Sequence, residues 1–239
     1  MVVCVVNSEK KGRFYGIGVG PGDPELLTRK AVRLLREAEV VAAADPGRGS
    51  SLALRIAAEH IRGKEILLCP APMTRDAARL RAAWTQGADL LCALLEQGRS
   101  VAFVTLGDPT IYSTCGYLFR RVRRRGYEAE LVPGVPSFCA AAAAAGLSLC
   151  EGEERLLLVP AGSPLLEESL REPGTRVVMK AGRSLPRLRA LLGDADAVLT
   201  ENCGMDGERV LPLAEAESSG YFSTVLVTDR LSEDYYSGK

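Results

Sequence analysis

Several sequence features that are typical of particular protein functions are rare in this chain, and each absence argues against one class of function. Its 239 residues include one histidine, His60, so neither a histidine-rich metal site nor a histidine-based catalytic triad is expected. Basic and acidic residues balance at 30 each, and a neutral chain is a poor generic binder of nucleic acid. We therefore expect no metal and no nucleic-acid partner.

Long apolar stretches and paired cysteines are also missing. No run of about 18 apolar residues occurs, so neither a membrane span nor a membrane partner is expected. The segment Met1–Asn7 lacks the basic start and the long apolar core of a signal peptide. The seven cysteines form no CxxC pair and their number is odd. This pattern fits reduced thiols in a cytoplasmic protein.

Apolar residues make up 47% of the chain and charged residues 25%, which predicts a packed globular core. Buried strand-like runs alternate with segments of helical periodicity along the whole length, and this alternation is typical of an α/β protein. The segment Pro133–Pro136 interrupts the pattern. We therefore expect two α/β lobes, residues 1–132 and 133–239.

The stretch Thr105–Tyr112 stands out as the centre of the first lobe. The apolar run Val101–Val104 precedes it and a helix-like run, Tyr112–Arg125, follows, which predicts a strand, a tight turn and the start of a helix. In an open parallel sheet small ligands bind at the carboxyl ends of the strands. An ordinary strand-to-helix turn has the same pattern, so this stretch alone leaves the function open.

A glycine-rich turn, Gly18–Pro24, follows the first predicted strand and invites comparison with nucleotide-binding loops. The dinucleotide fingerprint G-x-G-x-x-G fails in both registers, because its sixth position falls on Pro21 or Asp23. No Gly-Lys-Ser/Thr follows, so a Walker-type phosphate loop fails as well. Neither a Rossmann dehydrogenase nor a P-loop enzyme is predicted.

Three ordered motifs instead resemble those of the tetrapyrrole (corrin and sirohaem) methyltransferases, and the resemblance spans nearly the whole chain. The motifs are Val19–Thr28, Gly107–Tyr112 and Val132–Ser137. Finer features are similar to the members of the family that methylate C-20 of precorrin-2 or cobalt-factor II in cobalamin synthesis: Gly47–Leu54, Pro72–Asp76 with Trp84, Val178–Arg183 and Tyr221–Thr224. One departure is visible at Ala44–Pro46, where a tyrosine-proline loop entry would be expected.

The resemblance implies the two-lobed class III methyltransferase fold, with S-adenosylmethionine (SAM) in the cleft between the lobes, and a homodimer. It also implies which residues contact the cofactor. In the first lobe and at the start of the second, these are Pro21, Leu106, Gly107, Asp108, Ile111, Pro136 and Ser137. In the second lobe Lys180, Cys203 and Thr224 fall near the adenosine-contacting positions, although packing roles fit these three as well.

Transfer of a methyl group to carbon places its own demands on the site. The nucleophilic carbon, the methyl and the sulfur must be aligned, and a proton must leave the carbon afterwards. Asp108 or Tyr112 is placed in the turn to act as the base, although Tyr112 also fits a packing role. A tetrapyrrole carries many carboxylates, which arginine binds well, and this predicts substrate contacts from Arg48, Arg75 and Arg183.

Other functions remain compatible with the same motifs. One is methylation of a different tetrapyrrole carbon, as in enzymes acting on uroporphyrinogen-III or precorrin-4. Another is a non-catalytic protein that binds SAM or a tetrapyrrole. A ribosomal-RNA ribose methyltransferase of the same superfamily is the third, and the neutral charge of the chain counts against it.

Overall fold

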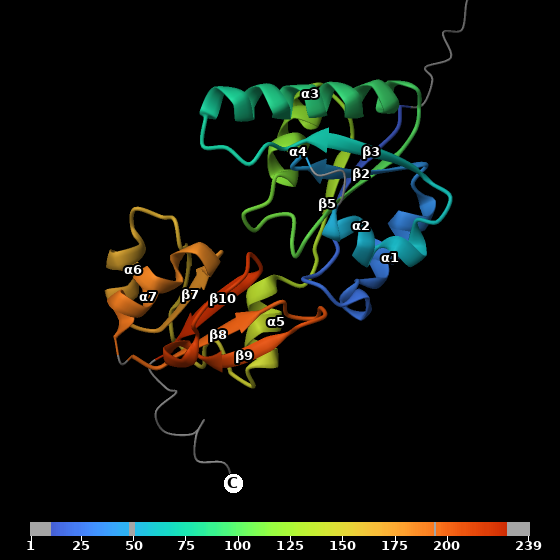
Figure 1. Cartoon of the computed structure of the whole chain (residues 1–239). Helices are drawn as coiled ribbons and strands as arrows, with labels where there is room; N and C mark the ends of the chain where they lie inside the picture. Colours follow the sequence, from blue (N-terminus) through green and yellow to red (C-terminus); the bar gives the residue numbers. More distant parts are fainter. Residues whose placement is uncertain (1–10, 48–50, 194, 229–239) are drawn as a thin grey trace, which may run out of the picture. The chain divides into compact units, whose positions relative to one another are not determined.

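The computed structural model describes residues 11–47, 51–193 and 195–228, and Figure 1 shows the chain as a cartoon. These residues fall into two compact units that divide between Val135 and Pro136. Each unit is built around its own five-stranded sheet.

The sheet of the first unit is entirely parallel, with strands in the order β3-β2-β4-β1-β5. Its strands are β1 (Phe14–Gly18), β2 (Val40–Asp45), β3 (Glu65–Pro70), β4 (Val101–Thr105) and β5 (Ala129–Val132). Because all five strands run the same way, their carboxyl ends share one edge of the sheet. The turns that leave β1, β4 and β5 therefore come together at that edge.

The helices of the first unit are α1 (Arg29–Glu37), α2 (Leu52–Ile56), α3 (Ala77–Glu96) and α4 (Cys115–Arg124), with the short 3₁₀ helices η1 (Pro24–Leu26) and η2 (Ala58–His60). Two of them, α1 and α3, begin at residues whose side chains cap them. The Thr28 hydroxyl accepts from the Ala31 N–H at 3.1 Å, which caps α1. The Asp76 carboxylate accepts from the N–H groups of Ala78 and Arg79, and these bonds hold the pKa of Asp76 below its ordinary value.

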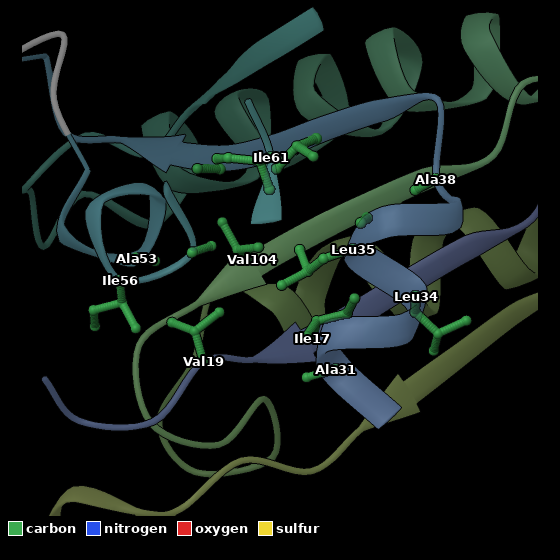
Figure 2. Packing of buried hydrophobic residues seen from close by; sticks show 14 of the residues in the cluster. Ile17, Val19, Ala31, Leu34, Leu35, Ala38, Ala53, Ile56, Ile61 and Val104 are labelled. Atoms are coloured by element: carbon green, nitrogen blue, oxygen red, sulfur yellow. The ribbon is translucent and has the colours of Figure 1, made fainter. Parts of the chain in front are cut away.

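Strand residues alternate between two cores on opposite faces of this sheet. Ile17, Val41 and Val104 pack with the residues of α1 and α2, as Figure 2 shows for part of this cluster. Phe14 and Phe103, which point the other way, pack with the residues of α3 and α4. Both faces of the parallel sheet are covered, so its central strands β1 and β4 are largely apolar.

The second unit has a mixed sheet in the order β6-β7-β10-β8-β9. Strands β6 and β7 are parallel, and the remaining pairs are antiparallel. Helix α5 lies against β8 and β10, while residues of α6 and α7 form a separate apolar core with the sheet. Its elements are α5 (Ser137–Ala144), β6 (Leu156–Pro160), α6 (Leu166–Arg171), β7 (Thr175–Met179), η3 (Gly182–Ser184), α7 (Leu185–Leu192), β8 (Ala197–Glu201), β9 (Arg209–Pro212), η4 (Leu213–Glu215) and β10 (Ser223–Val227).

Two expectations from the sequence need correction. The sequence of residues 51–60 predicts a single helix, but the structure divides this segment into α2 and η2. The helix after β4 begins at Cys115 and not at Tyr112, so residues 106–114 form a long turn. No helix among the described residues is long and apolar enough to cross a membrane.

Candidate functional site

The turns after β1 and β4 are joined directly at the carboxyl edge of the first sheet. Gly107 donates its N–H to the Gly20 carbonyl at 2.7 Å, and Gly20 returns an N–H to the Gly107 carbonyl at 3.3 Å. Gly20 has φ +78° and Gly107 has φ +66°, a region that residues with a side chain rarely occupy. The pairing of these two turns therefore depends on glycine at both positions.

A third turn, the one after β5, closes on the same point. A Cβ atom at Gly134 would lie 2.3 Å from the Gly107 carbonyl oxygen and 2.7 Å from the Gly18 carbonyl carbon. A Cβ at Gly18 would lie 2.6 Å from the Gly134 nitrogen. All of these neighbours are backbone atoms, which cannot move aside as a flexible side chain can. We call the meeting point of Gly18, Gly20, Gly107 and Gly134 the glycine junction.

Asp108 ties the central turn to the third turn. Its side chain is 7% exposed, and one carboxylate oxygen accepts from the Gly134 N–H at 3.1 Å. The other oxygen accepts from the Thr110 N–H at 2.8 Å and also from the Thr110 hydroxyl. Both oxygens are thus engaged inside the turn, which gives Asp108 a clear structural role beside the predicted role as base.

The other residues predicted to contact the cofactor in this unit surround the same junction. Pro21 is buried beside Gly20, while Leu106 and Ile111 are half-buried on either side of Asp108. Tyr112 is 48% exposed and has φ +46°. A left-handed backbone at a tyrosine is uncommon and costs free energy, so the surrounding turn must hold it there.

A hollow of about 460 Å³ opens at the carboxyl ends of β2 and β3. Three prolines stiffen its wall, and Arg79 from the first turn of α3 contributes a guanidinium group. It is lined by Asp45, Pro46, Gly47, Leu68, Pro70, Ala71, Pro72, Arg79, Ala82, Ala83 and Gln86. Arg75 is exposed in the loop between two of these lining residues, Pro72 and Arg79. The predicted Arg48 lies outside the described residues.

The second unit brings its predicted residues to one edge of its sheet. Thr224, in the middle strand β10, pairs with Met179 of β7 on one side and Thr200 of β8 on the other. Lys180 follows Met179 directly, and Cys203 follows two residues after the end of β8. Lys180, Cys203 and Thr224 therefore lie around the start of β10.

The backbone at this edge is held in two uncommon conformations. Lys180 has φ +60° and Asn202 has φ +54°, each directly after the last residue of its strand. Hydrogen bonds hold the backbone at both positions. Ala181, which follows Lys180, donates its N–H to the Ser223 carbonyl at 3.2 Å, and Asn202 donates its own N–H to the Phe222 carbonyl at 2.9 Å. Neither residue is glycine, so residue type alone does not predict these conformations.

Pro136 and Ser137 stand at the start of α5. The Pro136 carbonyl accepts from the N–H groups of Cys139 and Ala140 at 3.1 and 3.3 Å, which begins the helix. Ser137 is half-buried in its first turn, and Arg183 is exposed in η3. Within the described ranges, no group of three or more histidine, cysteine, aspartate or glutamate side chains could hold a metal ion.

Thiol reactivity offers a direct check on this geometry. Burial raises the pKa of Cys69 and of Cys115 to about 12, and the nearby charge of Asp108 adds to the effect at Cys115. Cys139 and Cys150 are exposed. We expect iodoacetamide at pH 8 to label Cys150 and Cys139 well before Cys69 or Cys115 in the folded protein, as peptide mass spectrometry would show. Early labelling of Cys115 would contradict the packing beneath the central turn.

Comparison with known proteins identifies the family. Residues 13–217 match the Tetrapyrrole (Corrin/Porphyrin) Methylases. The chain belongs to this family. Its two sheets are those of the tetrapyrrole methylase fold. The sequence-based prediction of family and fold class is confirmed.

Individual relatives agree with this assignment. The chain is 35% identical to the cobalt-precorrin-2 C(20)-methyltransferase of Salmonella typhimurium over 90% of its own length and 96% of that protein. It is also 35% identical to the cobalamin biosynthesis protein CobIJ of Mycobacterium tuberculosis, but spans only 46% of the length of that relative. A crystal structure of uroporphyrin-III C-methyl transferase from Thermus thermophilus, complexed with S-adenyl homocysteine, superimposes with a TM-score of 0.66 and 26% identity, covering 90% of this chain and 97% of that one.

Proposed function

We propose that this tetrapyrrole methylase transfers the methyl group of SAM to the C-20 meso carbon of precorrin-2 or cobalt-factor II, as a step of cobalamin biosynthesis. The observation that carries the proposal is the 35% identity to the Salmonella C(20)-methyltransferase over nearly the full length of both chains. The Thermus relative, complexed with S-adenyl homocysteine, supports SAM as the methyl donor. We further propose a cytoplasmic homodimer.

The residues at the two sheet edges fit such a cofactor. In the first unit the glycine junction presents backbone at the carboxyl edge of a parallel sheet, flanked by half-buried Leu106 and Ile111. Apolar side chains beside a tight backbone turn suit the methionine part of SAM. In the second unit, Lys180, Cys203 and Thr224 are proposed to contact the adenosine part.

SAM supplies a methyl group on a sulfonium, which is already a good electrophile. The task of the chain is to hold donor and acceptor in line and to exclude water, and positioning of this kind can supply about 7–11 kcal/mol in ideal cases. The C-20 carbon attacks the methyl, the bond from carbon to sulfur breaks, and a proton then leaves C-20. Asp108 and Tyr112 stay the proposed bases for that proton.

Anaerobic incubation with SAM and either precorrin-2 or cobalt-factor II, followed by mass spectrometry, tests the function. We expect the mass of one methyl group to be gained, and carbon-13 NMR with labelled SAM to place it at C-20. A methyl on another carbon would refute the C-20 assignment. SAM binding with no methyl transfer to either substrate would favour a non-catalytic binding protein.

Arg75 is proposed to bind a substrate carboxylate, as is Arg183. We expect Arg75→Ala to raise KM for the tetrapyrrole roughly tenfold or more, since a charge-assisted hydrogen bond is worth about 1.5–3 kcal/mol, with the Kd for S-adenosylhomocysteine unchanged. Arg81→Ala is the matched control, because Arg81 is exposed on α3 and lies outside the loop between Pro72 and Arg79 that carries Arg75. An unchanged KM in Arg75→Ala would remove this contact from the proposal.

A further inference from the structure

Two large aromatic side chains lie exposed directly before β10. Tyr221 is 57% exposed and Phe222 is 38% exposed, and their rings meet edge to face with centroids 5.1 Å apart. Burying such rings is strongly favourable, so exposed aromatic side chains side by side commonly mark a binding surface. The cofactor contacts proposed above do not use either ring.

A buried carboxylate and an arginine hold the backbone that carries these rings. Glu201, which is 6% exposed, accepts from the Gly220 N–H with one carboxylate oxygen and from Arg209 with the other. Arg209 in turn donates to the Ser218 carbonyl at 3.2 Å. A buried carboxylate therefore holds the loop of residues 218–220 through a charged hydrogen-bond network.

Further contacts hold the same loop. The Ser223 hydroxyl donates to the Gly220 carbonyl at 3.0 Å, and a Cβ at Gly182 would lie 1.9 Å from that carbonyl oxygen. Asn202 donates its N–H to the Phe222 carbonyl. Two exposed rings on a hydrogen-bonded loop are pre-organised, so a ligand that packs against them loses little free energy in ordering the loop.

The positive charge on the segment that contacts this loop indicates what kind of ligand the rings bind. Gly182, which touches the loop at Gly220, begins η3, and η3 carries the exposed guanidinium of Arg183. Lys180, also exposed, lies directly before Ala181, whose N–H bonds to Ser223. Apolar rings on a loop that contacts a segment carrying exposed cations suit a flat ligand with carboxylates at its rim. An adenine ring has no such anionic rim.

We propose that Tyr221 and Phe222 form an aromatic platform for the tetrapyrrole macrocycle, one ring lying against its face and the other meeting it edge-on, with Arg183 facing its carboxylates. This inference rests on the proposed function, because it takes the substrate class from there. It assigns to the two aromatic residues a role in substrate specificity and none in binding the methyl donor.

Binding measurements separate the platform from the chemistry. Sirohydrochlorin, the metal-free counterpart of cobalt-factor II, serves as the tetrapyrrole probe and is titrated anaerobically by its absorbance. We expect the double variant Tyr221→Ala with Phe222→Ala to weaken its binding about tenfold or more, since one stacked and one edge-to-face contact are lost. Calorimetry with S-adenosylhomocysteine should give an unchanged Kd. Leu165→Ala is the matched control, because Leu165 is 59% exposed in the same unit and lies away from this loop in the sequence.

Other outcomes overturn the platform. Unchanged sirohydrochlorin binding refutes it, and a loss confined to S-adenosylhomocysteine assigns the rings to adenine. If sedimentation shows that the double variant dissociates into monomers, the rings belong to an interface between copies. The wild-type protein gives the separate test of the proposed function: tetrapyrrole binding without a C-20 methyl product refutes the C-20 assignment and leaves the platform standing. No tetrapyrrole binding by the wild-type protein refutes both.

Discussion

Replacement of Gly134 by alanine is expected to destabilise the first unit by about 3 kcal/mol or more, at the upper end of what overpacking costs. The added methyl would meet the Gly107 carbonyl oxygen at 2.3 Å and the Gly18 backbone at 2.7 Å, and neither can rotate away. The turns after β1, β4 and β5 would have to separate. Urea unfolding and calorimetric binding of S-adenosylhomocysteine would both show the loss.

Gly116→Ala is the matched control for this experiment. Gly116 is the second residue of α4, and a Cβ there meets nothing nearer than 3.5 Å. Alanine is favoured over glycine in a helix by about 0.5–1 kcal/mol, so this variant should be at least as stable as the wild-type protein. Equal unfolding midpoints for Gly134→Ala and Gly116→Ala would show that the glycine junction is looser than described.

Asp108→Asn should lower both the stability of the protein and its affinity for S-adenosylhomocysteine. The two carboxylate oxygens accept from Gly134 N–H and Thr110 N–H, and an amide can supply only one oxygen for these two donors. The remaining N–H loses its acceptor in a largely buried turn, which costs about 1–3 kcal/mol. Displacement of the central turn should also reduce kcat/KM.

The pattern of losses in Asp108→Asn distinguishes its two proposed roles. If Asp108 acts by holding the turns together, Asp108→Asn should lose stability, cofactor affinity and turnover in parallel. A base acting alone predicts a fall in kcat and a changed pH–rate profile, with S-adenosylhomocysteine affinity and stability intact. Thr110→Val is the control, because it removes only the hydroxyl donor to Asp108 and keeps both N–H donors. Full turnover with normal cofactor affinity in Asp108→Asn would exclude both roles.

Much of the fold could be predicted because local patterns specify it. The strand Ala197–Glu201 and the helix Leu185–Leu192 lie where their apolar runs and helical spacing place them. The start of α4 could not be predicted in the same way. Hydrogen bonds within the turn, such as Ile111 N–H to the Asp108 carbonyl, keep residues before Cys115 out of the helix. The spacing of apolar residues does not predict such bonds.

Short motifs predict only part of the site. Gly107 and Asp108 can be predicted as site residues because they lie in one motif directly after one strand. The contact between Gly18 and Gly134 cannot be predicted in this way, since it joins residues more than a hundred positions apart and depends on the order of the strands. Likewise, the left-handed backbone of Lys180 and Asn202 arises from pairing with β10 and not from their residue types.

The position of β10 in the second sheet has a consequence for how this protein is made. Strands β7 and β8 are joined only through β10, the last strand of the described chain and the middle strand of its sheet. During synthesis, β6 with β7 and β8 with β9 can form only separate two-stranded pieces, which are marginal in water. The second unit therefore completes its sheet only after residue 227 has left the ribosome, and until then the edges of β7 and β8 are open to wrong partners.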